Sequence, residues 1–233
     1  MKCSIMQPTY FPWAGYFNLI SQCDKFIFLN DAQFVKSSWH SSNVIIVKGL
    51  KYKLTVPTKK SPLDTTIANK LCDNSQDWQK KHSKIILQSY SNYPYINDLK
   101  DLLFFFEALN FKSLAEYNIE IIKYISKKLN IETIFYNSDI FNFRNKRTAK
   151  VISILNKVNA TIYLSPEGSE NYLLEDKFSK LTDVKLEFNK YKSIDYHQKR
   201  QKYFIKNLSI IDVIGNLGWI KSEKYVKQNL YEQ

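Results

Sequence analysis

Glycine, proline and cysteine are all scarce in this chain of 233 residues, which has 5 glycines, 6 prolines and 3 cysteines. So few glycines and prolines argue against a loop-rich or fibrous protein. Cys3, Cys23 and Cys72 are odd in number and lack any C-x-x-C spacing, so the sequence predicts neither a disulfide framework nor a zinc site. Only 3 histidines are present, without an H-E-x-x-H pair, and we expect no metal site.

Long hydrophobic runs and the common nucleotide or hydrolase motifs are also missing. Gln7, Pro8 and Pro12 interrupt the start of the chain before an apolar signal region can form, and every apolar run is far shorter than a bilayer span. We therefore expect a cytoplasmic protein with no membrane span. A Walker loop, G-x-G-x-x-G and G-x-S-x-G are all absent, which removes several common enzyme classes.

What the chain has in quantity is aromatic residues and positive charge. A hydrophobic content of 44% with 15% aromatics can build a sizeable core. The net charge of +12 favours acidic partners such as nucleic acid, nucleotide phosphates or an anionic membrane face. Lysines scattered over a solvated surface would give the same total, so the charge alone does not decide the function.

Alternating strand and helix patterns predict an α/β fold with a mostly parallel sheet flanked by helices. The expected strands are residues 3–6, 26–29, 53–57, 131–136, 161–164 and 184–188. Helices are expected to begin at Trp13 and at Ser209, and another is expected over residues 149–158. A helical insertion is expected at about 75–130. Ser113 and Glu116 have capping-box spacing. We expect residues 1–233 to form one domain.

Polar residues follow the predicted strands, where parallel sheets collect their ligands. Such residues are Gln7 after the first strand, Asp31 and Gln33 after the second, and Ser165, Glu167 and Gly168 after a later one. These side chains could form the rim of a pocket. Polar turns that simply end each strand would produce the same pattern.

The segment "QPTYFPWAGYF", residues 7–17, joins the first strand to the first helix. Pro12 suits a helix start, and Gly15 in the first turn leaves room for a ligand or another backbone to come close. The helix amino end suits a phosphate or carboxylate. Tyr10, Trp13 and Tyr16 could then wall a base or a sugar ring, although they could equally be core residues.

The polar stretch "FVKSSWHSSN", residues 34–43, contains the best-placed acid/base candidate, His40. An unperturbed histidine titrates near ~6.5, so it can exchange protons near neutral pH. We predict His40 and Asp31 as catalytic residues, with Trp39, Asn43 and Gln198 as further ligand-binding residues. An exposed loop histidine is the plainer interpretation of His40.

Several blocks of the chain resemble the WbqC-like family. They include "MQPTYFPWAGYFNLI", "DKFIFLNDAQFVKSSW", "YLSPEGSENYL", the "YHQ" near residue 197 and "LSIIDVIGNLG". The resemblance runs from about residue 2 to 218. Members often carry "NRN" where this chain has Ser41, Ser42 and Asn43, so an anion-binding role for this loop is in doubt.

The resemblance implies a role in bacterial O-antigen and surface-polysaccharide synthesis, with glycine transfer suggested for the family. The opening strand–helix–strand layout is similar to that of the HIGH-type nucleotidyl-transferases, which implies ATP as an activator, although the HIGH histidines are absent. One hypothesis is a transferase that places glycine or a similar acyl group on a nucleotide-linked amino-sugar, with aminoacyl-tRNA as a further donor. The other is a non-catalytic sugar- or nucleotide-binding accessory protein of the same pathway.

Overall fold

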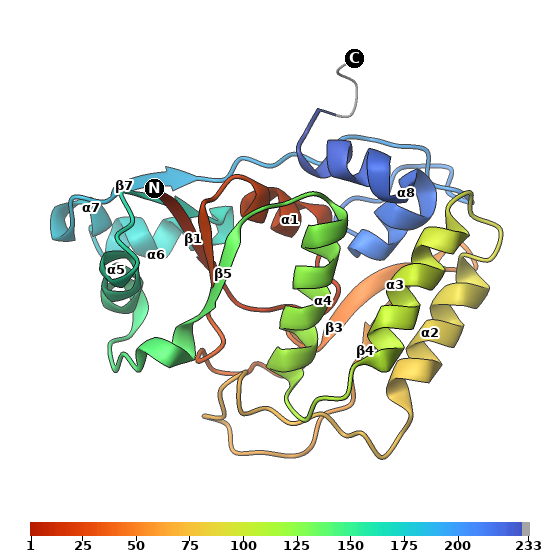
Figure 1. Ribbon diagram of the computed structural model, residues 1–233, viewed down its shortest axis with the longest axis horizontal. Coiled ribbons are helices and arrows are strands. Elements are labelled where there is room, and N and C mark those ends of the chain that lie inside the picture. The colour runs from red at the N-terminus through yellow and green to blue at the C-terminus, as the bar shows by residue number, and fades with distance from the viewer. Residues whose placement is uncertain (230–233) are drawn as a thin grey trace.

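A five-stranded parallel sheet forms one half of the molecule (Figure 1) in this computed structural model, which describes residues 1–229. Its strand order is β5-β2-β1-β6-β7. The strands are β1 (Lys2–Met6), β2 (Lys25–Phe28), β5 (Ile134–Asn137), β6 (Ile162–Ser165) and β7 (Lys185–Phe188). Chain order therefore runs outward in one direction from β1 to β5 and in the other from β6 to β7, so the topology switches between β1 and β6.

Each face of this sheet is covered by its own set of helices, because successive side chains of a strand point to opposite faces. Phe26 and Phe28 pack into the larger core with α1 (Ala14–Ser21) and α4 (Leu114–Lys128). Cys3 and Ile27 pack into the smaller core on the other face. That face is covered by α5 (Arg147–Lys157), α6 (Glu170–Glu175) and α7 (Phe178–Leu181).

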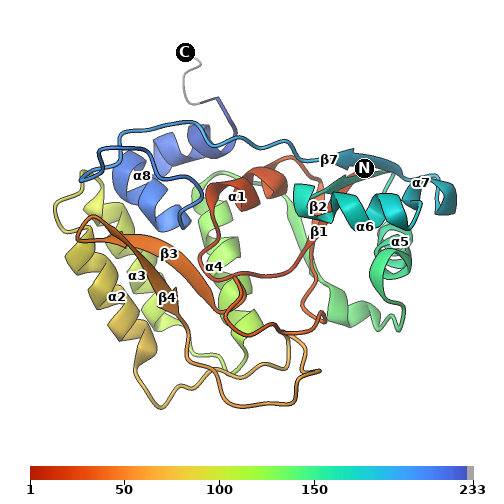
Figure 2. The ribbon, with the colours of Figure 1, turned by 180° about the vertical axis from the view of Figure 1, so that it is seen from behind.

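The long connection from β2 to β5 builds the other half of the molecule. It holds an antiparallel hairpin, β3 (Ser42–Val47) and β4 (Leu50–Thr55), followed by α2 (Trp78–Ser89), α3 (Ile96–Ala108) and α4. Figure 2 shows the hairpin on the far side of the molecule from β7 and α7. Aromatic contacts join the helices: the Trp78 ring meets Tyr117 edge-on at 5.2 Å, and Phe105 stacks on Tyr124 at 4.0 Å.

The chain after β7 runs as an extended strap to α8 (Ile210–Val226), which lies beside α1 (Figures 1 and 2). A buried carboxylate holds this strap down: Asp212 accepts hydrogen bonds from the hydroxyls of Tyr90 and Tyr196 at 3.1 and 2.6 Å. Gly218 has φ +68°, so α8 is kinked there. Within residues 1–229, no helix has the length and apolar character needed to cross a bilayer.

The α/β class and the mostly parallel sheet are confirmed, and three helices span the predicted insertion. The capping box is present, with Ser113 and Glu116 both bonded as expected. Residues 53–57 overlap a strand, but β4 pairs with β3 in the separate hairpin and ends before Pro57. Strand β3 was not predicted, because its apolar residues follow directly on a polar stretch.

Candidate functional site

A cavity of about 250 Å³ opens beyond Met6 at the carboxyl end of β1, and it adjoins a smaller cavity that reaches Glu167 after β6, where the topology switches. Open α/β sheets bind their ligands at this place, because the connections leave a crevice there. The cavity is lined by Met6, Thr9, Trp13, Tyr16, Trp39, Asn43 and Asn207. We call it the aromatic cavity. Four of these residues, namely Trp13, Tyr16, Trp39 and Asn43, are predicted ligand-binding residues.

A smaller cavity of about 50 Å³ adjoins it and shares the lining residues Met6, Trp13 and Tyr16. Its other lining residues are Gly15, Leu19, Pro166, Glu167, Asn189 and Tyr191. Glu167 follows β6 and brings a carboxylate to this end of the site. Among residues 1–229, the Tyr16 phenol is the one ionisable group that lines the aromatic cavity. Burial holds the pKa of that phenol well above its ordinary value, so Tyr16 stays neutral.

The turn that carries these residues is held in a strained conformation by side chains from distant segments. Phe11 has φ +39°, an uncommon value for a bulky residue. Its carbonyl accepts hydrogen bonds from the Asn43 amide at 2.7 Å and from the Ser209 hydroxyl at 2.9 Å. Asn43 also donates to the Tyr10 carbonyl at 3.1 Å. Asn43 therefore both lines the cavity and fixes the turn.

Gly15 leaves room for the indole of Trp13. A methyl group at residue 15 would stand 2.3 Å from the nearest indole carbon, so no larger residue fits while Trp13 keeps this position. The indole also meets the ring of Tyr191 edge-on at 5.3 Å. The space that the glycine leaves is thus filled by the protein itself, and Trp13 becomes a fixed wall between the two cavities.

Tyr10 lies in the larger core and lines neither cavity. Its side chain is fully buried and packs against Phe11, Trp78 and Phe106, and its hydroxyl forms a 2.8 Å hydrogen bond with His82 Nδ1. Burial lowers the pKa of His82 to about 4, so this imidazole is neutral at pH 7.

His40 is buried beside the site and uses both ring nitrogens within the protein. The Val35 N–H donates to Nδ1 at 3.3 Å, and Nε2 lies 3.2 Å from the Gln7 side-chain oxygen. This pattern assigns the proton to Nε2, which then donates to Gln7. Burial lowers the pKa of His40 to about 4. The structure thus places His40 as a neutral group that orients Gln7.

Asp31 stands at the carboxyl end of β2, and its two oxygens contact Lys150 Nζ and the Ser138 hydroxyl, each at 2.5 Å. The Asp31 and Lys150 side chains are 19% and 15% exposed, so this ion pair is mostly shielded from water. Asp31 lines neither cavity of the site. The geometry gives it a firm role in joining β2 to α5.

The other predicted residues lie apart from both cavities. Gln33 donates to the Leu63 carbonyl at 2.7 Å, and Ser165 is buried with its hydroxyl toward the Pro166 carbonyl. Gln198 joins the Asp212 network, donating to that carboxylate at 3.1 Å. Gly168 faces open space. Of the 14 residues predicted from the sequence, the structure gathers Trp13, Gly15, Tyr16, Trp39, Asn43 and Glu167 around one site.

Comparison with known proteins gives one family and one relative. The model of the WbqC-like protein family matches residues 7–224. The chain belongs to this family. The chain is also 28% identical over 221 residues to the uncharacterized protein Rv1507c of Mycobacterium tuberculosis, covering 93% of this chain and 94% of that protein. No solved structure gave a significant match.

This WbqC-like protein has no arginine at residues 41–43, where the loop after β2 leads into β3. Ser41 and Ser42 are buried there, and the Ser42 hydroxyl donates to the Ser38 carbonyl at 2.8 Å. Neither serine lines a cavity of the site. Only Asn43, of the three residues at this position, reaches the aromatic cavity.

Several residues that complete the site were not predicted from the sequence. Thr9 lies inside the quoted turn, but its small polar side chain gave no signal beside so many aromatic rings. Asn207 and Tyr191 reach the site from the strap after β7. Their contribution depends on a chain path across α1 that no local sequence pattern predicts.

Proposed function

We propose that the aromatic cavity binds the sugar ring of a nucleotide-linked amino-sugar and that the protein transfers glycine or a similar small acyl group to it. In a bacterium, such a reaction would belong to O-antigen or surface-polysaccharide synthesis. The observation that carries the proposal is a cavity beyond the carboxyl end of β1 with walls of Trp13, Tyr16 and Trp39, joined to a smaller cavity that Glu167 lines after β6.

The size and lining of the cavity support a sugar ring as the ligand. Its volume of about 250 Å³ lies just below the range of pockets for drug-sized ligands, so it suits one ring better than a whole dinucleotide. Flat aromatic walls offer apolar contact to the ring faces. Thr9, Asn43 and Asn207 add hydrogen-bonding groups for hydroxyls.

Transfer of an acyl group to an amine requires a base that accepts the ammonium proton of the acceptor. Glu167, in the adjoining cavity, is the carboxylate best placed for this role. His40 is less suited, because its Nδ1 already accepts the Val35 N–H. We assign His40 the role of orienting the Gln7 side chain. The backbone carbonyl of Gln7 separately accepts a hydrogen bond from the Tyr16 hydroxyl at 3.0 Å.

The surroundings of Gly15 do not favour a triphosphate at the start of α1. The Trp13 indole lies directly over the glycine, where a phosphate would have to approach the backbone. The acyl group would arrive already activated, either as the ester of aminoacyl-tRNA, from which the tRNA hydroxyl leaves as the amide bond forms, or as an adenylate made elsewhere from glycine and ATP, from which AMP leaves.

The test is an acyl-transfer assay with two donors. Purified protein is incubated with a panel of nucleotide-linked amino-sugars and either glycyl-tRNA or glycine plus ATP, and the glycylated sugar is detected by mass. Glu167→Gln should abolish turnover and keep sugar binding. Glu170→Gln, on a carboxylate that lines neither cavity, is the matched control and should leave both unchanged.

One observation favours a second function, that of a non-catalytic sugar-binding accessory protein. Among the described residues, the aromatic cavity is lined by neutral side chains, and the carboxylate of Glu167 lines only the smaller cavity. Measurable sugar binding without turnover for either donor would support this function over the transferase. Failure to bind any amino-sugar would overturn both.

A further inference from the structure

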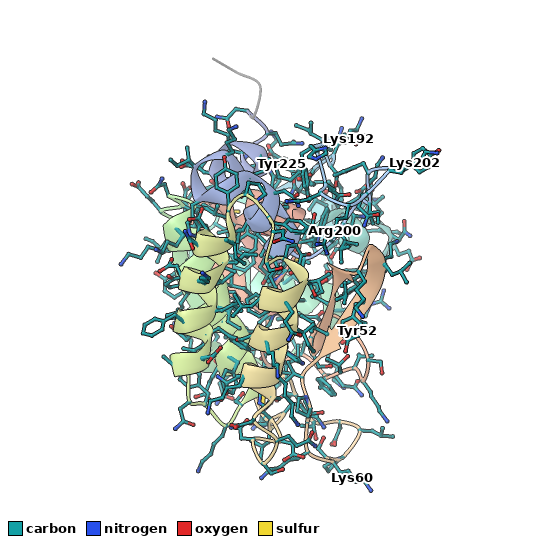
Figure 3. The ribbon with its side chains drawn as sticks, turned by 90° about the vertical axis from the view of Figure 1, so that its right-hand side faces the viewer. Tyr52, Lys60, Lys192, Arg200, Lys202 and Tyr225 are labelled. Atoms are coloured by element: carbon teal, nitrogen blue, oxygen red, sulfur yellow. The ribbon has the colours of Figure 1, made fainter. Side chains whose placement is uncertain are left out.

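A third cavity, larger than the other two, is lined mainly by residues of the connection between β4 and α2, and four of its lining residues are lysines. Its volume is about 380 Å³. The lining residues are Phe34, Lys36, Thr58, Lys59, Lys60, Ser61, Pro62, Leu63 and Lys70. We call it the lysine hollow. It shares no lining residue with the aromatic cavity. Figure 3 shows Lys60 at the end of the molecule opposite α8 and its neighbours Lys192 and Lys202.

Lys70 sets this hollow apart from an ordinary lysine-rich surface, because it is only 6% exposed. A buried ammonium is costly unless it is paired with an opposite charge or well hydrogen-bonded. Within residues 1–229 Lys70 forms no salt bridge. Its Nζ instead donates to the Lys59 carbonyl at 2.6 Å and to the Ser61 hydroxyl at 2.8 Å, and it lies 4.8 Å from the centre of the Phe34 ring.

These contacts hold the ammonium in place without neutralising it. An ammonium has three N–H donors, and the two hydrogen bonds leave one of them for a ligand in the hollow. Burial, and secondly the charge of Lys36, lower the pKa of Lys70. Both causes disfavour the charged form of Lys70. A bound anion would stabilise that charged form by direct attraction.

The backbone around Lys70 is fixed on both sides, so the hollow is a built feature. The Lys70 N–H donates to the Ile67 carbonyl at 3.2 Å, and its carbonyl accepts the Leu114 N–H at 2.8 Å. The Lys59 N–H donates to the Leu71 carbonyl at 3.0 Å, which ties the two segments of the loop together. Nearby, Asp73 already accepts hydrogen bonds from Ser75 and lies outside the lining.

We propose that the lysine hollow is an anion site that binds a phosphate or diphosphate group, with Lys70 as its buried anchor and Lys36, Lys59 and Lys60 around its rim. Lysine is a common point-charge partner of phosphate. Several cations around one hollow favour a ligand with two or more negative charges over a single carboxylate. The phosphate can come from a soluble nucleotide or diphosphate, or from a phosphorylated lipid.

Binding of inorganic pyrophosphate, measured by calorimetry at low salt, tests the soluble source. Lys70→Met keeps the apolar stem and should weaken binding more than tenfold. Lys36→Met and Lys60→Met replace exposed side chains, so neither should disturb the fold. Each should weaken binding a few-fold. Lys84→Met is the matched control, because Lys84 is exposed on α2 and lies outside the hollow.

Sedimentation with phosphatidylcholine vesicles that contain phosphatidic acid tests the lipid source. Binding to these vesicles that is lost in Lys70→Met would support the site and identify a lipid phosphate. Equal affinity of all four variants and the unchanged protein for both probes would overturn the proposal, as would no binding to either probe. Equal weakening by Lys84→Met would also overturn it, because overall charge would then explain the binding.

Discussion

The two ends of the segment 7–17 carry the same kind of side chain in opposite surroundings. Tyr10 and Phe11 are fully buried among α2 and α3 residues, and they help to form the larger core. Trp13, a few residues later, is only partly buried and lines both cavities, and Tyr16 belongs to the same core but also lines both cavities. Aromatic density alone therefore does not define a binding wall. What separates the two ends is which distant segment lies against each.

The turn between them explains how one short segment can serve both purposes. The left-handed conformation of Phe11 reverses the chain direction, and Asn43 and Ser209 hold its carbonyl in that position. Tyr10 and Phe11 pack against Phe106 of the insertion half, whereas Trp13 lies between the two cavities. If this division is right, substitutions at the first end change stability, and substitutions at the second end change binding.

Tyr10→Ala should produce the largest loss of stability. It empties a fully buried ring site and leaves His82 Nδ1 without its partner, so we expect a cost of about 3–5 kcal/mol. Urea unfolding, monitored by circular dichroism, measures this loss of unfolding free energy. Tyr10→Phe is the control, since it removes only the hydroxyl and should cost about 1–3 kcal/mol. A loss below about 1 kcal/mol for Tyr10→Ala would place this ring outside the core.

Acid should destabilise the protein through the two buried histidines. The pKa of His40 and of His82 is about 4 in the folded protein, against ~6.5 in an unfolded chain, so the unfolded state binds protons first as pH falls. The unfolding free energy that the two histidines contribute is fully present above about pH 6.5 and is lost as the pH falls from 6.5 to 4. At about 1.4 kcal/mol per pKa unit, each histidine accounts for on the order of 3 kcal/mol.

The measurement is the free energy of unfolding from pH 7.5 to 4, compared between the unchanged protein and the variants His40→Gln and His82→Gln. Each variant should flatten the decline by a similar amount, since the two rings have similar burial and pKa. Carboxylates titrate in every protein of the set and cancel in the comparison. A slope that neither variant changes would mean that both histidines titrate with the same pKa in the folded and the unfolded protein.

Gly15→Ala should have a smaller effect on stability, because it displaces the Trp13 indole without opening the core. The new methyl group meets the indole at 2.3 Å, and we expect a net loss of about 1–2 kcal/mol together with a shift in tryptophan fluorescence. Gly168→Ala is the matched control, because no atom lies within 4 Å of its added methyl group. Equal stability of the two variants would show that Trp13 moves aside freely.

Much of the sheet could be predicted from the sequence, because apolar runs such as "KFIFL" and "TIYL" mark buried parallel strands locally. The strand order could not, since it depends on pairing between segments more than a hundred residues apart, as for β1 and β6. For the same reason Tyr10 and Trp13 looked alike. Tyr10 is a core residue because it packs against Trp78 and bonds to His82. Trp13 is a cavity wall because it packs against Tyr191.

Trp39→Ala should change stability least, so it separates an effect on binding from an effect on stability most clearly. The Trp39 side chain is 56% exposed and lines the aromatic cavity, and its carbonyl, which accepts the Tyr10 N–H, survives the substitution. We expect a stability change within about 0.5 kcal/mol. Binding of a nucleotide-linked amino-sugar, measured by calorimetry, should weaken roughly tenfold or more, which corresponds to about 1.4 kcal/mol. Tyr203→Ala, at an exposed ring outside the cavity, should leave binding unchanged. Equal effects of the two substitutions would remove Trp39 from the site and leave the cavity without its outer wall.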